Sequence, residues 1–361
     1  MEYTPTFRLS AEGKDITDAI QRGLNNIKLT DYGGATGKSD TLAITLFSET
    51  LCLPSKGARL QLGLGFNDEI IDKGWFVVSQ VQSGGPPRQI TITATAAPMN
   101  SAKQSGNVTS HKTRSFDDVT LGDIVKTIAT DNGLKPRIAE ALASIKIAHI
   151  DQVRESDAAL LSRLAKQYDA VSKPSGGYWL FLLQGDGTTI SGKALPTATI
   201  TPDMVSRWNY SEGERDGASK GKSEGKTEGK IGVNYFDATT GETKTVQTDH
   251  PGGGDKQHPY TQANKETAEA SAKSKATQMK RNGRKMSLSM PGRPSLLPIT
   301  AECRVNTAGF GVREDHAWLT ESVTFSLGTG GMTMDFSLTT DIKPQGKKGV
   351  KDKKSGPDYF S

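Results

Sequence analysis

Aromatic and apolar residues are scarce in this sequence, at 6% and 34% of 361 residues. It has no run of 18 apolar residues, so we expect no membrane-spanning helix and no membrane insertion. Residues 1–6 contain neither a basic region nor an apolar segment, and a secretory signal is therefore not expected. The only two cysteines, Cys52 and Cys303, lie in strand-like surroundings, which favours two packed thiols in a reducing compartment.

Glycine is abundant, at 39 residues, which favours turns and many short strands. The length allows two or three domains. Much of the formal charge of +5 comes from lysines in residues 343–361, which we expect to form a basic, disordered tail. The lysines between 220 and 230 alternate with Glu224 and Glu228, so we expect no specific nucleic-acid binding.

Residues 1–100 show the two-residue period of half-buried strands. Leu42, Ile44 and Leu46 alternate with polar or small residues, and the same pattern recurs from Leu60 and from Ile90. The breaker at residues 83–87 should join two antiparallel strands. Such a set of strands closes most economically as a barrel or a small sandwich.

Residues 101–199 change to a helical period and predict a small α+β module. One helix should begin at Thr120, which forms a capping box with Asp123, and should end at Gly133. A second should begin at Ser156, and a strand should span residues 178–183. The second helix should pack against this strand. The side chains predicted to hold the module together are Leu121, Ile124, Ile128, Leu160, Leu161, Leu164, Tyr168 and Trp179.

Residues 200–342 return to a β pattern, with Trp318 as a further structural side chain. We expect a charged mobile loop at 212–230, a hairpin from 231 to 246 and a loop at 248–260. A helix over 261–281 has a narrow alanine-rich face, so it should lie on the outside of a sheet. Two further strands should be joined by residues 328–331.

Candidate chemical sites are weak. Residues 33–39 resemble a phosphate-binding loop, but Tyr32 stands where the first glycine is required and a strand follows, so a turn is favoured. His250 and His258 lie in a glycine-rich stretch without a compact ligand set, which favours a polar loop over a metal site. Glu212 falls in the expected mobile loop, where nothing would tune its pKa. We therefore predict no catalytic, cofactor-binding or metal-binding residues.

The order of these regions resembles the phage late control protein D family, the central hub proteins of contractile tails and R-type bacteriocins. The similarity spans about residues 4–342 and rests on the order of several short segments. They include residues 13–17, 29–31, 39–42, 57–60 and 74–78, then 120–124, 155–157 and 161–165, and finally 309–311 and 330–334. The sequence departs from the family at Met332, where a tyrosine is usual, and in the length and charge of 212–230.

The resemblance implies two related β-barrel, tube-like domains, at 1–100 and 200–342, that flank a LysM-like module at 101–199. It implies a homotrimer in which six barrels form a ring that connects a six-fold tail tube to a three-fold central spike. The implied partners are the spike, the tube protein or its initiator, baseplate wedge proteins and the tape-measure protein. The implied location is the virion tail baseplate, assembled in the host bacterial cytoplasm.

Two alternatives stay open at the level of sequence. The first is a spike component of the type VI secretion class, which would carry an added domain and a β-helix of short repeats. The second is a cell-wall-cleaving enzyme that holds glycan through the LysM-like piece. That enzyme would need a catalytic carboxylate in an ordered cleft.

Overall fold

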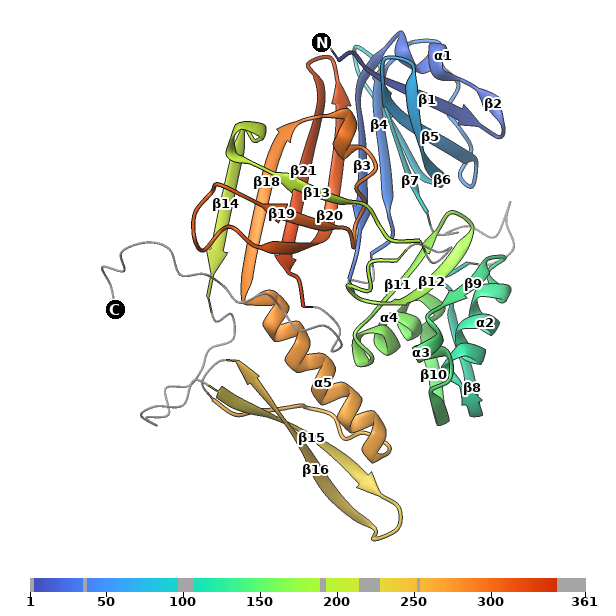
Figure 1. Cartoon of the computed structure of the whole chain (residues 1–361). Helices are drawn as coiled ribbons and strands as arrows, with labels where there is room; N and C mark the ends of the chain where they lie inside the picture. Colours follow the sequence, from blue (N-terminus) through green and yellow to red (C-terminus); the bar gives the residue numbers. More distant parts are fainter. Residues whose placement is uncertain are drawn as a thin grey trace.

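The computed structural model describes residues 3–34, 38–96, 107–188, 193–213, 228–251 and 254–342. Within them the protein is mainly β, with an α+β module inserted between two β-rich regions (Figure 1). The two β-rich regions lie side by side, the module lies below the first, and a hairpin with a long helix extends below the second (Figure 1).

The first β-rich region begins with alternating residues that bury one face of each strand. In β4, for example, Leu42, Ile44 and Leu46 are fully buried. The predicted turn at 83–87 joins two antiparallel strands, β6 and β7. The elements are β1 (Pro5–Ala11), β2 (Lys14–Asp15), α1 (Thr17–Gln21), β3 (Leu24–Tyr32), β4 (Thr41–Phe47), β5 (Arg59–Phe66), β6 (Glu69–Gly84) and β7 (Gln89–Thr95).

The second β-rich region continues the same sheet, because β20 pairs with β3. The result is a 13-stranded sheet that runs from β14 at one end to β2 at the other. The elements are β13 (Thr197–Ile200), η1 (Pro202–Met204), β14 (Arg207–Glu212), β18 (Arg284–Pro291), η2 (Pro294–Leu296), β19 (Arg304–Thr307), β20 (Ala317–Gly328) and β21 (Gly331–Thr340).

The two β-rich regions repeat one four-stranded arrangement. The first region has the order β3-β4-β7-β6, and the second has the order β14-β18-β21-β20 with corresponding connections. The register repeats as well. Leu42 of β4 pairs with Leu29 of β3, and at the equivalent place in the second unit Met286 of β18 pairs with Tyr210 of β14. Both units carry a bulge in their last strand, after Val78 in β6 and after Thr320 in β20. The units follow each other head to tail, since β20 of the second pairs with β3 of the first.

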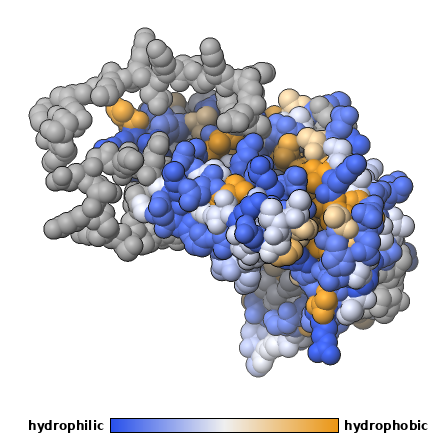
Figure 2. Space-filling model, turned by 90° about the horizontal axis from the view of Figure 1, so that it is seen from below, coloured by the Kyte–Doolittle hydropathy of each residue, from blue (hydrophilic) through white to orange (hydrophobic). Residues whose placement is uncertain are grey.

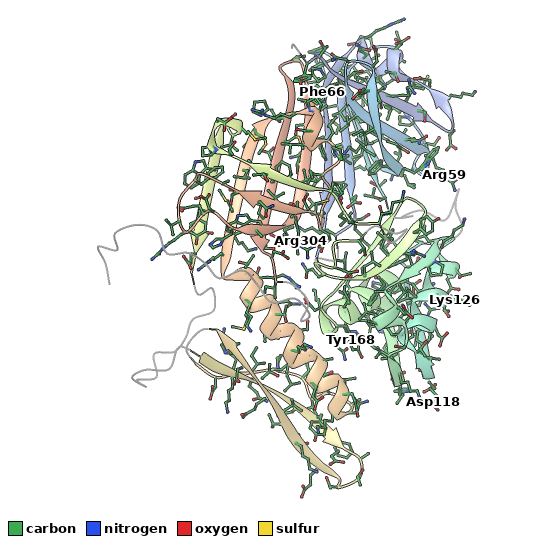
Figure 3. The ribbon with its side chains drawn as sticks, in the orientation of Figure 1. Arg59, Phe66, Asp118, Lys126, Tyr168 and Arg304 are labelled. Atoms are coloured by element: carbon green, nitrogen blue, oxygen red, sulfur yellow. The ribbon has the colours of Figure 1, made fainter. Side chains whose placement is uncertain are left out.

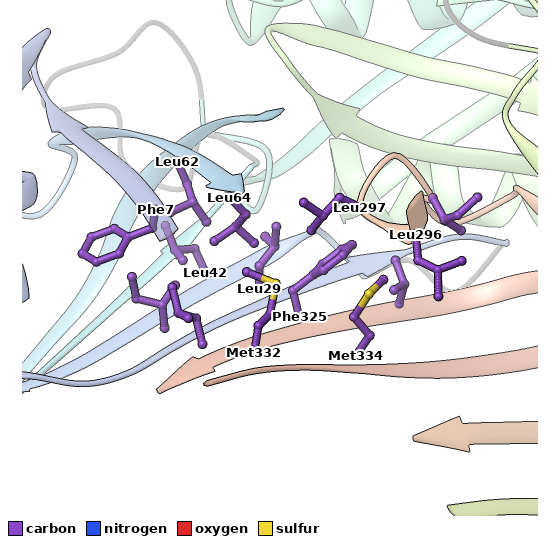
Figure 4. Packing of buried hydrophobic residues seen from close by; sticks show 14 of the residues in the cluster. Phe7, Leu29, Leu42, Leu62, Leu64, Leu296, Leu297, Phe325, Met332 and Met334 are labelled. Carbon is purple, nitrogen blue, oxygen red and sulfur yellow. The ribbon is translucent and has the colours of Figure 1, made fainter. Parts of the chain in front are cut away.

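One hydrophobic core serves both units. Phe325 of β20 and Leu29 of β3 lie side by side in it (Figure 4). Leu64 of the first region and Met334 of the second belong to the same cluster. The two units are therefore joined by shared packing as well as by strand pairing.

The module at 107–188 has the predicted ends of its first long helix and the predicted start of its second. Thr120 and Asp123 form the capping box of α2, and Gly133 takes the positive φ of 67° that ends it. The Ser156 hydroxyl accepts a hydrogen bond from the Ala159 N–H at the start of α4. The elements are β8 (His111–Thr120), α2 (Leu121–Asp131), β9 (Lys135–Ile138), α3 (Glu140–Ala143), β10 (Lys146–Ser156), α4 (Asp157–Gln167), β11 (Ala170–Ser175) and β12 (Tyr178–Leu183).

The insertion between β14 and β18 differs from the prediction. It holds a long hairpin, β15 (Glu228–Asp237) and β16 (Glu242–Pro251), with β17 (Lys256–Gln257) and α5 (Lys265–Asn282). The predicted loops at 212–230 and 248–260 are thus partly wrong, because Glu212, 228–230 and 248–251 are strand residues, while 214–227 lie outside the described residues. As predicted, the helix α5 lies on the outside of a sheet, namely the sheet of β15, β16 and β17, and it also contacts α4.

The two cysteines differ in burial. Cys303 is buried, but Cys52 is exposed, so the prediction of two packed thiols is wrong for Cys52. The alternating pattern near Cys52 belongs to β4 and β5, and Cys52 lies between them.

Seen from below, the described surface is largely hydrophilic, with hydrophobic residues in small groups (Figure 2). No helix in the described ranges is both long and apolar enough to cross a bilayer.

Candidate functional site at the junction of the three parts

Lys173 of β11 joins the module to the first β unit. Its Nζ lies 2.6 Å from Asp31 Oδ1 and 3.1 Å from Asp40 Oδ1, and it donates a hydrogen bond to the Tyr32 carbonyl at 2.7 Å. The side chains of Lys173, Asp31 and Asp40 are 11%, 16% and 10% exposed. A buried cation in contact with two carboxyl groups fixes the position of β11 against β3 and β4.

The electrostatics of this cluster follow from burial and from one shared cation. Burial raises the pKa of Asp40 to about 7, and the neighbouring Asp31 adds to the rise. Burial also opposes ionisation of Asp31, but contact with Lys173 outweighs it and lowers the pKa of Asp31. Burial disfavours the ammonium of Lys173, yet the two acidic neighbours raise its pKa above the ordinary value. The cluster therefore holds a firm Lys173–Asp31 ion pair beside a carboxyl group that readily carries a proton.

Glu302 connects all three parts. Its Oε1 accepts a hydrogen bond from the Gly34 N–H at 2.6 Å, and its Oε2 accepts one from the Gly185 N–H at 2.9 Å. The adjacent Ala301 N–H donates to Asp31 Oδ2 at 2.9 Å. Burial raises the pKa of Glu302. A side chain at Gly33 would meet Glu302 Oε1 at 2.6 Å, so glycine permits this close approach.

Two arginines strengthen the junction from the second unit and from α5. Arg304, at the base of the sheet in Figure 3, donates to Asp341 Oδ2 at 2.8 Å and to the Gly185 carbonyl at 2.6 Å. The buried Arg281 of α5 pairs through both terminal nitrogens with the Asp169 carboxylate of the module. Bidentate pairs of this kind fix orientation as well as distance.

A cavity of about 630 Å³ lies where the three parts meet, and its wall is mostly apolar. Lys73 projects into it, with Nζ 4.1 Å from the centre of the Phe325 ring and a hydrogen bond to the Leu297 carbonyl. Burial lowers the pKa of Lys73 to about 8. Of the charged groups in the cavity wall, Lys173 pairs with Asp31 and Asp40, whereas Glu302 and Lys73 bond to backbone groups of other parts of the chain. This arrangement suits a rigid joint between domains.

The predicted structural residues occupy two places. The structure brings eight of them together in the module core, where all except the half-buried Tyr168 are at most 1% exposed: Leu121, Ile124, Ile128, Leu160, Leu161, Leu164, Tyr168 and Trp179. Tyr168 lies at the side of the module that faces α5 (Figure 3). Trp318 instead belongs to the core of the sheet, where its Nε1 donates to Thr307 Oγ1 at 2.8 Å.

Sequence reasoning also missed a buried carboxylate inside the module, Asp157, at the first turn of α4. Its carboxylate receives Lys112 Nζ at 2.7 Å, Arg114 Nη2 at 2.8 Å and Asn132 Nδ2 at 2.7 Å. Burial opposes ionisation, but these donors lower the pKa of Asp157. The alternation of Lys112 and Arg114 on β8, the strand that precedes α2, was the available signal.

The weak chemical candidates do not assemble into a site. His250 is a buried residue of β16, not part of a polar loop, and its Nε2 lies 3.1 Å from the Gly254 carbonyl oxygen. Glu212 is ordered in β14, where Arg284 Nε donates to it at 2.8 Å. Residues 33–39 connect β3 to β4, although 35–37 lie outside the described residues. The described residues include no group of three His, Cys, Asp or Glu side chains placed to hold a metal ion.

Comparison with known proteins gives matches along most of the chain. A family described as "Phage tail baseplate hub (GPD)" matches residues 107–331. A probable baseplate hub protein of Escherichia phage 186 is 28% identical over 94% of this chain and 93% of that relative. A probable baseplate hub protein of Escherichia phage P2 is 37% identical over 59% of this chain, and the match spans 54% of the P2 protein.

Solved structures show the same fold at low identity. The 43 kDa tail protein of prophage MuSo2 from Shewanella oneidensis has a TM-score of 0.65 at 16% identity, and the match covers 94% of this chain and 99% of that one. A component of the Escherichia coli type VI secretion system has a TM-score of 0.58 at 9% identity, with 95% of this chain and 79% of that one covered.

Proposed function

Since the chain belongs to the phage tail baseplate hub family, we propose that it forms a homotrimeric ring that adapts a six-fold tail tube to a three-fold central spike. The observation that carries this proposal is the head-to-tail repeat of two four-stranded units in one chain. Three copies would present six such units. A closed ring satisfies every heterologous contact and leaves two faces free for other proteins.

The junction supports this role by holding the parts in fixed positions. Lys173, Glu302 and Arg281 each connect different parts through buried contacts. We propose that the division into 1–100, 101–199 and 200–342 is functional. The repeated units would form the ring, and the module, for which a LysM-like fold stays a prediction, would meet wedge proteins at the periphery.

The partners on this proposal are the central spike protein, the tail tube protein or its initiator, and the tape-measure protein inside the ring. The location is the tail baseplate of the virion, after assembly in the host cytoplasm. We propose a structural role without enzyme activity. A turbidity assay on peptidoglycan tests this part, because clear lysis by the purified chain would contradict it.

The test of the ring is the mass of the purified full chain in solution, together with low-resolution particle images. We expect three copies and a ring with six similar lobes. A different closed number, or a particle without six lobes, would contradict the adaptor.

The second candidate is a spike component of the type VI secretion class, favoured by the fold shared with the Escherichia coli protein. Both roles use the same ring, so mass does not separate them. Co-purification does: a hub should recover the tube and spike proteins of a contractile tail when it is tagged in its own host, whereas a secretion component should recover secretion proteins.

A further inference from the structure

We propose that β6 of one copy pairs antiparallel with β14 of the next copy, in the register that β20 and β3 already use within the chain. The inference rests on the proposed ring and names the strands that close it. The repeat described above makes β6 equivalent to β20, and β14 equivalent to β3.

The outer edges of these strands match in detail. Before its bulge β20 pairs with β19, and after the bulge, from Ser322, the same edge pairs with β3. In the same way β6 pairs with β5 before its bulge, through Val77. After the bulge, from Gln80 onward, this edge of β6 has no partner among the described strands. The outer edge of β14 ends the sheet and likewise lacks a described partner.

The repeat also fixes which residues face each other. Within the chain, Val323 pairs with Asp31 and Phe325 pairs with Leu29. Transfer of this register to the equivalent strands places Val81 opposite Glu212 of the neighbouring copy. It also places Ser83 opposite Tyr210 of that copy.

Backbone hydrogen bonding checks the β14 side of this register. The Gly213 N–H donates to the Gly283 carbonyl, so odd-numbered residues of β14 bond to β18. In an antiparallel pair, bonded and non-bonded residues alternate. The N–H and C=O groups of Trp208, Tyr210 and Glu212 therefore point outward.

The β6 side gives the complementary result. The Ala96 N–H donates to the Asp40 carbonyl, so even-numbered residues of β7 bond to β4 and odd-numbered ones bond to β6. After the bulge, the odd-numbered residues of β7 pair with even-numbered residues of β6, such as Gln82. The N–H and C=O groups of Val81 and Ser83 therefore point away from β7, toward the outer edge. The transferred register therefore joins outward-facing groups on both strands, whereas a shift by one residue would not.

Side-chain exposure supports a second copy as the occupant of these edges. Ile27 of β3, which pairs with Leu327 of β20 in the shared core, is 1% exposed, while the equivalent residue of β14, Trp208, is 41% exposed. A neighbouring unit in the β20 position would cover Trp208. Since every copy carries one β6 edge and one β14 edge, head-to-tail pairing uses both and closes without a third kind of chain.

A designed disulfide tests the register. Gln82 would face Ser211 of the neighbour as a non-bonded pair, with Cα atoms about 4.5 Å apart, within the range of about 4.4–6.8 Å for disulfides. We expect Gln82→Cys/Ser211→Cys, in a Cys52→Ser background, to yield covalent trimers on a non-reducing gel. The matched control, Gln82→Cys/Arg207→Cys, moves the second thiol about 13 Å along the strand and should stay uncrosslinked.

The experiments distinguish a wrong strand register from a wrong ring. Trimers by mass that do not crosslink through 82 and 211 would overturn the register and leave the ring intact. A chain that stays monomeric at every concentration and does not crosslink would overturn both.

A proline variant gives an independent measurement. The Ser83 N–H points outward, so Ser83→Pro removes a bond to the neighbour and keeps the β6–β7 bonds. We expect unchanged melting of the monomer and self-association weakened by about tenfold or more. Association at the original strength would overturn the pairing.

Discussion

At the scale of single residues, Lys173 shows how one side chain holds two domains in position. Its ammonium is the cation in contact with both Asp31 and Asp40, two acids whose ionisation is opposed by burial. Removal of one member of a buried ion pair is costly because the remaining charge is left in a poorly solvated place.

We therefore expect Lys173→Met to lower the free energy of unfolding by about 3–5 kcal/mol, as measured by urea denaturation at neutral pH. The matched control is Lys285→Met, which removes a partly exposed pair with Glu321 at 3.4 Å and should cost less than about 1 kcal/mol. Equal effects of the two substitutions would show that the Lys173 cluster does not stabilise the junction.

The residues of the junction could not be predicted from the sequence, for a physical reason. Lys173 stands in a short polar segment that reads like many exposed strand ends, and its partners are far away in the chain. Glu302 likewise bonds to Gly34 and Gly185 across long separations. Local patterns report periodicity and caps, but they carry no signal for which distant groups meet.

At the scale of elements, local signals were sufficient where the chain forms its own contacts. Both ends of α2 and the start of α4 followed from capping residues, and β12 has the predicted bounds, 178–183. The hairpin β15–β16 was predicted too short, because its ends are polar strand residues stabilised by pairing and by α5. Polar composition there indicated loops, and tertiary contacts outweighed it.

The buried apolar face of α4 offers a direct test of packing. Leu161 and Leu164 are at most 1% exposed and belong to the module core with Trp179. We expect Leu161→Ala or Leu164→Ala to cost about 2–5 kcal/mol of unfolding free energy, read from thermal or urea unfolding. Lys166→Ala, on the exposed side of the same helix, should change stability little. An unchanged melting temperature for either leucine variant would mean that this face of α4 is not packed in the module core.

At the scale of the whole molecule, the repeat of the two units is a property of topology. Leu42 and Met286 occupy equivalent positions, yet the residues themselves do not reveal the relation. The order of strands and the positions of the bulges reveal it. The resemblance to tail hubs implied two related domains, and the registers show how one sheet contains both.

Because one core serves both units, we expect them to unfold together. Phe325 packs at their boundary and lies under the Lys73 ammonium. Phe325→Ala should therefore lower the free energy of unfolding by about 3–5 kcal/mol and should raise hydrogen exchange in β4 and β21 alike. Phe236→Ala, on the exposed hairpin, should leave exchange in both strands unchanged. Faster exchange in β21 with full protection of β4 would show two independent units, and a ring built from them would then flex at every β20–β3 boundary.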